Sequence, residues 1–180
     1  LQGPTGSGKS LALNMIAGLK RPSFGQVFVA GECINDFTER QMLFVRRSMG
    51  IMIQECLLLE DRTIEENIML PALAAEESIR EARERAERAM SDCGISELAS
   101  KYPSALSAGQ KQIACLARAI VNRPVVVLAD EPCAHLDIDN AQHLMDLLGN
   151  VSIMGVSVIV ASHIELFPAT AACRHITLTG

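Results

Sequence analysis

The feature that most constrains the fold lies at the start of the chain, where residues 3–10 read G-P-T-G-S-G-K-S. This is a complete G-x-x-x-x-G-K-S phosphate-binding loop, whose glycines let the backbone curl so that successive N–H groups point inward at an anion. Residues 11–17 are predicted to form a helix, and the N-terminal dipole of a helix also favours an anion. Because such a loop follows a strand, we expect at least one strand upstream of Leu1.

The polar residues of this loop predict a site for a nucleoside triphosphate. Lys9 can reach the β- and γ-phosphates, and the hydroxyl of Ser10 can ligate Mg²⁺. The residues expected to contact the nucleotide here are Gly3, Pro4, Thr5, Gly6, Ser7, Gly8, Lys9, Ser10 and Leu11.

Length and charge narrow the class of protein. The chain has 180 residues, which is enough for one domain with a substantial core. Its net charge of −5 argues against a non-specific nucleic-acid binder, because such proteins are normally basic. No apolar run is long enough to cross a bilayer. We therefore expect a globular domain that does not itself span a membrane.

The order of apolar and polar segments predicts an α/β fold. Strands are expected where the chain is continuously apolar, and helices where apolar residues recur at helical spacing. Such alternation is typical of a largely parallel sheet covered by helices. The predicted strands are 25–31, 49–54, 125–129, 156–161 and 175–178. The predicted helices are 11–17, 38–48, 64–92 with an interruption at Pro71, 108–121 and 141–149.

The cysteines and histidines do not indicate a structural metal. The six cysteines form no C-x-x-C pair, and the four histidines do not pair with them at zinc spacing. Because a chain of this kind points to the reducing cytosol, we expect the thiols to be free.

Two adjacent carboxylates end one of the predicted strands. The strand 125–129 leads directly into Asp130 and Glu131, and the carboxyl ends of parallel strands open onto the ligand crevice of such folds. Asp130 can hold Mg²⁺ through water, and Glu131 can polarise a water molecule for attack on the γ-phosphate. The pair therefore predicts hydrolysis of the bound nucleotide.

A short motif before the helix at 108–121 resembles a known family. Residues 106–110 read L-S-A-G-Q, which resembles the L-S-G-G-Q signature of ATP-binding cassette (ABC) ATPases, with Ala108 in place of the first glycine. In that family the signature of one subunit closes over the ATP held by another. The resemblance therefore implies a homodimer in which the signature contacts the ATP of the second copy. The signature residues are Ser107, Ala108, Gly109 and Gln110.

Three further residues match the family in its order. Gln54 ends a predicted strand, Asp137 closes the sequence A-H-L-D, and His163 follows the strand 156–161. They are similar to the Q-loop glutamine, the D-loop aspartate at the dimer interface and the switch histidine at the γ-phosphate. The resemblance implies catalysis by Lys9, Gln54, Glu131 and His163, and Mg²⁺ binding by Ser10, Gln54 and Asp130.

The resemblance covers nearly the whole chain. It implies a P-loop NTPase fold of ABC type, with a largely parallel sheet, that forms one domain over residues 1–180. A helical subdomain that carries the signature is expected over about 60–120, and the first strand or strands of the fold are expected upstream.

A short sequence after Gln54 favours one group within the family. The leucines at 57–59 and the sequence Asp61-Arg62-Thr63 resemble the bacterial cell-division ATPases, which work with a membrane protein to control peptidoglycan hydrolases. The resemblance implies a peripheral protein at the cytoplasmic face of the inner membrane. Lipoprotein-releasing and macrolide-exporting ATPases have similar surroundings and remain alternatives. A DNA-repair type ABC ATPase, or a module that binds ATP without hydrolysing it, is less well supported by these residues.

Overall fold

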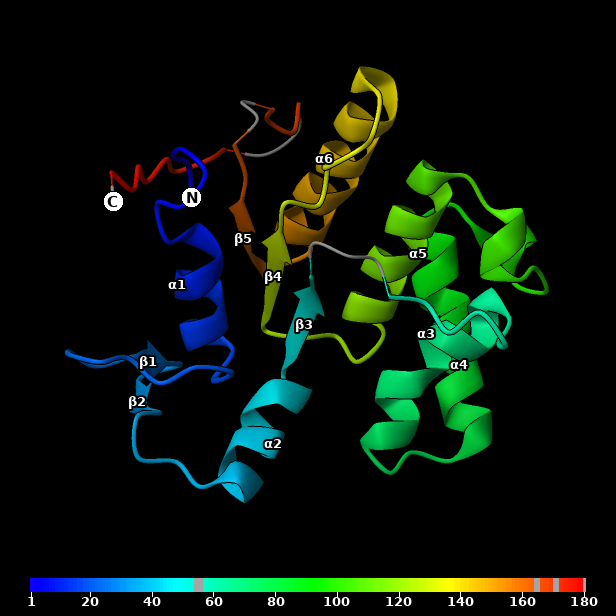
Figure 1. Ribbon diagram of the computed structural model, residues 1–180. Coiled ribbons are helices and arrows are strands. Elements are labelled where there is room, and N and C mark those ends of the chain that lie inside the picture. The colour runs from blue at the N-terminus through cyan, green and yellow to red at the C-terminus, as the bar shows by residue number, and fades with distance from the viewer. Residues whose placement is uncertain (54–56, 164–165, 170–171, 180) are drawn as a thin grey trace.

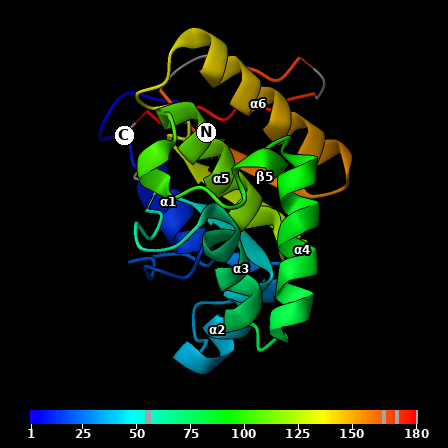
Figure 2. The ribbon, with the colours of Figure 1, turned by 90° about the vertical axis from the view of Figure 1, so that its right-hand side faces the viewer.

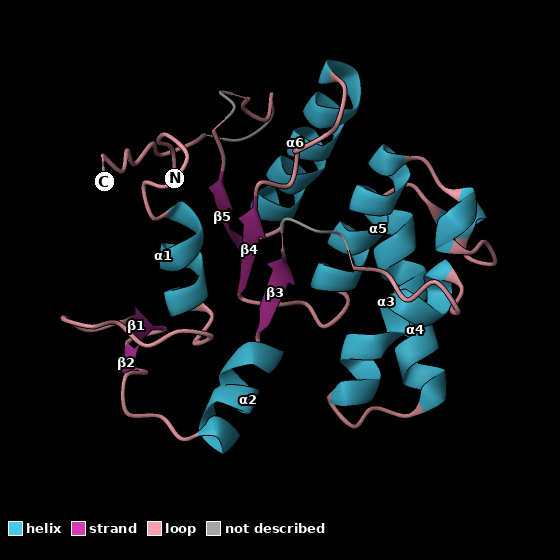
Figure 3. Ribbon diagram, in the orientation of Figure 1, coloured by secondary structure: helices cyan, strands magenta, loops and turns pink. Residues whose placement is uncertain are grey.

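The computed structural model covers residues 1–180 and describes all of them except 54–56, 164–165, 170–171 and 180. Its main sheet contains β3 (Met49–Met52), β4 (Val126–Asp130) and β5 (Ser157–Ala161). The strands are parallel and lie in the order β3-β4-β5, with Met49 opposite Val126 and Val126 opposite Ser157. All three point to the same edge of the sheet, which is uppermost in Figure 3. This arrangement confirms the predicted parallel α/β architecture.

Helices cover both faces of the sheet because the side chains of β4 alternate between them. Val126 and Leu128 pack with residues of α1 (Lys9–Ile16), whereas Val127 and Ala129 pack into the core formed with α5 (Ala108–Ile120) and α6 (Ile138–Ile153). Figure 1 shows α1 on one side of the sheet and α5 on the other. The phosphate-binding loop thus leads into a helix that lies directly on the sheet.

The start of the chain lies beside the carboxyl end of β5. Gln2 forms parallel bridges with Ser162 and with Thr177, so it sits between the residue that follows β5 and the C-terminal segment. The N–H of Ser162 donates to Leu1 O at 3.0 Å, and the N–H of Gln2 donates to Ile176 O at 2.9 Å. The phosphate-binding loop therefore leaves the sheet at the same edge as β4 and β5.

A layer of three helices forms the right-hand part of the molecule in Figure 1 and faces the viewer in Figure 2. It consists of α3 (Ile64–Ala74), α4 (Ile79–Asp92) and α5, with the short 3-10 turns η1 (Ser96–Leu98) and η2 (Pro103–Ala105) between the last two. Each of the three helices begins with a capping box, in which the N-cap side chain and the N3 side chain bond each other's backbone N–H.

The charged helix α4 buries a narrow stripe of small residues. Ala82 and Ala86 have no exposed surface and Ala89 is also buried, while the charged residues between them are on the solvent side. Ile79, the first residue of the helix, is exposed. Most of the charged residues of α4 therefore face solvent, and the helix packs along one face only.

The region between α1 and β3 is small and contains a hairpin. Its strands are β1 (Phe28–Val29) and β2 (Glu32–Cys33), which pair antiparallel. The turn residues Ala30 and Gly31 have φ angles of 51° and 85°, the left-handed values that a two-residue hairpin needs. The predicted strand at 25–31 is therefore shorter than expected and has an unexpected partner. The helix α2 (Glu39–Arg47), capped by Thr38, follows as predicted.

Three predicted elements need correction. The helix at 64–92 is not interrupted at Pro71, because Ile64, Ile68 and Ala72 are fully buried at helical spacing and carry α3 through the proline; the break comes at residues 75–78. The helix α6 extends beyond the predicted 141–149 at both ends. The segment 175–178 makes a bridge between Thr177 and Gln2 but no named strand.

The expectation of free thiols is only partly right. Cys33, Cys93, Cys133 and Cys173 are free, but Cys115 in α5 is disulfide-bonded. Scatter along the sequence does not limit which cysteines the fold brings together, and this is why the prediction failed for Cys115. Within the described part of the chain, no helix is both long and apolar enough to cross a bilayer.

Candidate active site

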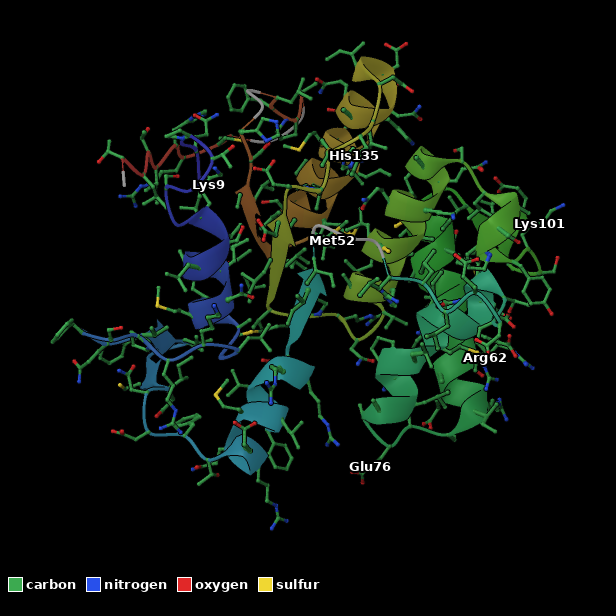
Figure 4. The ribbon with its side chains drawn as sticks, viewed as in Figure 1. Lys9, Met52, Arg62, Glu76, Lys101 and His135 are labelled. Carbon is green, nitrogen blue, oxygen red and sulfur yellow. The ribbon has the colours of Figure 1, made fainter. Side chains whose placement is uncertain are left out.

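The phosphate-binding loop and the ends of β4 and β5 meet at one edge of the sheet. Figure 4 places Lys9 at the start of α1 and Met52 at the end of β3, both toward this edge. The chain folds this way because parallel strands end together and a helix that follows a short loop must begin there. The site is therefore assembled from segments that are more than 100 residues apart in the sequence.

Glycines shape the phosphate-binding loop. Gly6 and Gly8 have φ angles of 87° and 90°, which L-residues with a side chain rarely adopt, and Gly8 is the N-cap of α1. A side chain at Gly3 would collide with the carbonyl oxygen of Leu178. The hydroxyl of Ser7 is buried and has no hydrogen-bond partner among the described residues. An unsatisfied buried donor beside turned-in backbone fits a loop that surrounds a polar ligand such as phosphate.

Lys9 lies across this loop. Its side chain is only 6% exposed, and Nζ donates to Gly3 O at 2.7 Å and to Pro4 O at 3.1 Å. Nζ also lies 3.9 Å from Oε1 of Glu131. The ammonium group is therefore held inside the loop, between its carbonyls and the catalytic carboxylate predicted from the sequence.

Ser10 and Asp130 form the pair that could hold Mg²⁺. The Ser10 hydroxyl donates to Oδ1 of Asp130 at 3.0 Å, which joins the first turn of α1 to the end of β4. Within the described residues there is no group of three or more His, Cys, Asp or Glu that could hold a metal. Mg²⁺ is commonly bound by one or two protein oxygens together with water and substrate phosphates, so a hydroxyl and one carboxylate fit this ion.

Glu131 and His163 form a close pair beside them. His163 Nδ1 lies 2.8 Å from Oε2 of Glu131, and the backbone N–H of His163 also reaches Oε2, at 3.3 Å. The Glu131 side chain is 11% exposed and that of His163 is 54% exposed. With Lys9 near Oε1 and His163 on Oε2, the carboxylate is fixed on both oxygens. A fixed and nearly buried carboxylate can accept a proton from a water molecule on the open side of the site.

The backbone at Glu131 has an unusual conformation. Its φ angle is 46°, and its N–H donates to Ala161 O at 2.8 Å, so the chain turns sharply where β4 ends beside β5. A left-handed glutamate is uncommon and costs free energy that neighbouring contacts must offset. Here the hydrogen bond to Ala161 O, the ion pair with Lys9 and the contacts of His163 supply that free energy and aim the carboxylate at the phosphate-binding loop.

The signature residues lie at the start of α5. Ser107 Oγ accepts from Gln110 N at 3.2 Å, and Gln110 Oε1 accepts from Ser107 N at 3.0 Å. Ser107 and Ala108 are exposed, whereas Gly109 is buried. Among the described residues, no hydrogen bond connects Ser107 or Gln110 to the phosphate-binding loop of the same chain. The structure thus assembles the loop, Ser10, Asp130, Glu131 and His163, but does not bring the signature to them.

Asp137 is the N-cap of α6. Its carboxylate accepts hydrogen bonds from the backbone N–H and then the side-chain amide of Asn140, and these bonds lower the pKa of Asp137 below its ordinary value of 3.8. Gln54 lies outside the described residues, so its role stays a prediction.

Two further residues, Cys133 and Asn140, lie beside the site residues. Cys133 is buried behind Glu131, and burial together with the charge of Glu131 raises the pKa of its thiol to about 11. The thiol is therefore neutral and inert at ordinary pH. Sequence reasoning missed Asn140, although an amide three residues after an aspartate that precedes a helix is a signal that could have identified it.

A family model described as ABC transporter matches residues 1–134. The chain belongs to the ABC transporter family of ATPases. The cell-division ATP-binding protein FtsE of Escherichia coli (strain K12) is 35% identical over 179 residues, covering 99% of this chain and 81% of that protein. The lipoprotein-releasing system protein LolD of Buchnera aphidicola subsp. Schizaphis graminum is 34% identical over 165 residues, covering 91% of this chain and 72% of LolD.

A solved structure supports the same assignment. The ATP-binding cassette MJ0796, in a dimeric post-hydrolysis state bound to ADP and Pi, matches with a TM-score of 0.80 and 33% identity, covering 91% of this chain and 73% of that one. The family membership predicted from the motifs is therefore confirmed, and so is the ABC-type fold. This chain is an ABC ATPase.

Proposed function

We propose that two copies of this chain enclose two ATP molecules between them and hydrolyse ATP to ADP and phosphate. The observation that carries the proposal is the division of the site within one copy. The phosphate-binding loop, Asp130 and Glu131 meet at one edge, while within the described residues no hydrogen bond links the exposed Ser107 of the signature to them. A second copy related by two-fold symmetry would supply the missing half. We also propose that residues 1–180 act as one ATPase domain with a helical subdomain over about 60–120.

Each residue has a role in this scheme. Lys9 and the N–H groups of the loop bind the β- and γ-phosphates and stabilise the negative charge that develops on them. Glu131 accepts a proton from the attacking water, and His163 holds the carboxylate in position and lies at the open side near the γ-phosphate. Gln54 orients the water and senses the metal. Mg²⁺, held by Ser10, Asp130 and Gln54, would supply positive charge at the phosphates.

Replacing Glu131 by Gln tests the hydrolytic step. The amide cannot accept the proton from water, so we expect single-turnover hydrolysis to fall by about 10²- to 10⁴-fold while ATP binding is retained. The ATP-bound dimer should then accumulate, which sedimentation or light scattering would detect.

The matched control for that substitution is Glu87→Gln, on the exposed side of α4, which removes the same charge far from the loop. It should hydrolyse ATP at the parent rate. If Glu131→Gln turned over ATP in a single turnover as fast as the parent chain, another group would have to be the base.

The loop before α3 offers a surface at which a membrane protein could bind. In the string Asp61-Arg62-Thr63, Thr63 caps α3, but the side chains of Asp61 and Arg62 are 82% and 54% exposed. Neither is needed for a buried contact, so they are available to a partner. We propose that this is a membrane protein like FtsX, the partner of FtsE, that hydrolysis drives it in control of peptidoglycan hydrolases, and that the chain acts peripherally at the cytoplasmic face of the inner membrane.

The runner-up is the ATPase subunit of a lipoprotein-releasing or macrolide-export system, since LolD is nearly as similar as FtsE. A DNA-repair type ABC ATPase is disfavoured because such chains insert a long coiled coil before the signature half. Here the helices before α5 have only 11 and 14 residues.

Co-purification from membranes tests the partner. We expect the intact protein to retain a four-span membrane protein with a large extracytoplasmic domain. Replacing Asp61 and Arg62 by Ala should abolish this retention and leave basal ATP hydrolysis unchanged, because neither side chain touches the phosphate-binding edge. Arg80→Ala, at an 88% exposed position on α4, is the control and should retain the partner. Retention of a lipoprotein-handling permease instead would favour the runner-up.

A further inference from the structure

Both carboxylate oxygens of Asp137 accept hydrogen bonds from Asn140. The backbone N–H of Asn140 donates to Oδ1 at 2.9 Å, and its side-chain Nδ2 donates to Oδ2 at 2.6 Å. The carboxylate is therefore fixed in one orientation at the start of α6, although both residues are exposed.

The other side of the Asn140 amide lies against the signature. A Cβ atom built on Gly109 would lie 2.7 Å from Oδ1 of Asn140 and 2.9 Å from its Cγ. At these separations a side chain at position 109 would require the Asn140 amide to shift, because the amide lies directly against the backbone of α5. In Figure 1, α5 and α6 both begin toward the edge of the sheet where the strands end. One amide thus contacts the D-loop aspartate and the signature glycine.

Helix capping alone does not explain this arrangement. The bond from Asn140 N to Oδ1 already satisfies a free backbone donor of α6, which is what an N-cap does. In the capping boxes of α3 and α4 the N3 side chain accepts from the N-cap N–H, whereas the Asn140 amide is turned to the carboxylate and to Gly109. The side chain therefore joins two helices rather than completing one of them.

We propose that Asn140 is a positioning residue that holds the D-loop carboxylate and the signature glycine as one rigid unit. This inference rests on the proposed function, in which one copy covers the nucleotide of another with these two segments. If they are already fixed relative to each other, less ordering is required when the two copies close on ATP. Asn140 touches neither the nucleotide nor the reacting water, so it acts through Asp137 and Gly109.

The test measures ATP-dependent dimerisation of the intact protein carrying Glu131→Gln, with Asn140→Ala added. Asn140→Ala removes the hydrogen bond from Asn140 Nδ2 to Asp137 Oδ2. Its loss should raise the ATP concentration needed for half-maximal dimerisation by about three- to tenfold. Asp139→Ala is the control, because it removes the neighbouring side chain in the same first turn of α6 and leaves the Asn140 amide in place. Backbone hydrogen exchange in residues 107–111 should also become faster in Asn140→Ala and not in the control.

A charge-matched pair sharpens the test. Asp139→Asn combined with Asn140→Asp keeps the net charge but places a second carboxylate against Asp137. It should weaken dimerisation at least as much as Asn140→Ala does. If Asn140→Ala and Asp139→Ala gave the same dimerisation curve and the same exchange in α5, Asn140 would be a helix cap only and the inference would fail alone. If the Glu131→Gln parent formed no ATP-dependent dimer, the proposed function would fail, and the inference with it.

Discussion

The helical layer of α3, α4 and α5 and the edge of the sheet that carries the phosphate-binding loop differ in backbone strain and in hydrogen bonding. In α3, α4 and α5 each helix starts with a complete capping box, and the fully buried Asn67 has its amide hydrogen-bonded on both atoms. At the edge, Glu131 and His135 have left-handed φ angles and the Ser7 hydroxyl is buried without a described partner. Apart from Pro71 within α3 and the left-handed Glu76 that follows it, local preferences and tertiary contacts agree in the first region, and they conflict in the second.

This difference separates stability from function. Agreement between local and global preferences is what makes a segment fold reliably, while strained backbone and unsatisfied polar groups persist only where surrounding contacts hold them. The helical layer should therefore contribute strongly to the free energy of unfolding. The edge should tolerate substitutions with small effects on stability and large effects on hydrolysis.

The largest expected effect on stability is at Asn67. Its Oδ1 accepts from Leu59 N at 2.7 Å, and its Nδ2 lies 2.9–3.2 Å from the carbonyl oxygens of Leu59, Arg62 and Thr63. Asn67→Ala leaves these groups unpaired around a fully buried position, so the free energy of unfolding should fall by about 3–5 kcal/mol. Urea denaturation measures it.

Two comparison variants accompany that change. Asn67→Asp has the same shape but turns an acceptor toward the three carbonyls, and it should be at least as destabilising. Ser10→Ala at the edge removes one hydrogen bond to Asp130 and should cost only about 1 kcal/mol. Equal losses for Asn67→Ala and Ser10→Ala would contradict the contrast between the regions.

Much of the phosphate-binding edge could be predicted from the sequence because its chemistry depends on short sequence motifs. The spacing of the glycines at 3–8 determines the shape of the loop. A buried strand that ends in Asp130 and Glu131 must place both carboxylates at the edge where the carboxyl ends of parallel strands meet. The same reasoning gave the parallel sheet, since β4 and β5 are continuous apolar runs. Local patterns therefore located the chemistry and the core strands.

What the sequence missed depends on contacts between distant segments. Pro71 is a helix breaker by local preference, but the buried ladder of Ile64, Ile68 and Ala72 against the neighbouring helices outweighs it. The contact of Asn140 with Gly109 joins α5 to α6, and no local pattern in either helix reports it. The segment 175–178 has the composition of a strand, but Gln2 is the residue with which it pairs.

A matched pair of N-caps within the helical layer separates an effect on stability from an effect on function. Ser78 begins α4 and Ser107 begins α5, and each accepts a hydrogen bond of 3.2 Å from the N3 backbone N–H. Replacement of either by Ala should lower the free energy of unfolding by about 1 kcal/mol. Only Ser107→Ala should also impair ATP hydrolysis, by about 100-fold, because its hydroxyl is proposed to contact the nucleotide of the second copy. Steady-state ATPase assays beside thermal melts would show the difference, and equal activity of the two variants would remove Ser107 from the site.

The smallest expected effect is on the pH dependence of stability. Hydrogen bonds from Thr63 and Ser78 lower the pKa values of Glu66 and Glu81 below their ordinary 4.5. Because the pKa of each is lower in the folded state, the stabilisation is present above pH 4.5 and is lost as the pH falls through the folded pKa. Urea denaturation at a series of pH values between about 3 and 6 should show a shallower acid limb in Glu66→Gln and Glu81→Gln, by less than one proton each.

The third capping box supplies the control for this titration, because its N3 residue, Gln110, carries no charge. The start of α5 should therefore contribute nothing to the acid limb in the parent chain. Gln110→Glu should add a new acid-sensitive step of the same sign, since its carboxylate would accept the same bond from Ser107 N that the amide oxygen accepts now. An acid limb that is unchanged in Glu66→Gln, Glu81→Gln and Gln110→Glu alike would show that the capping boxes of the helical layer do not govern its stability. The contrast with the edge would then rest on buried packing alone.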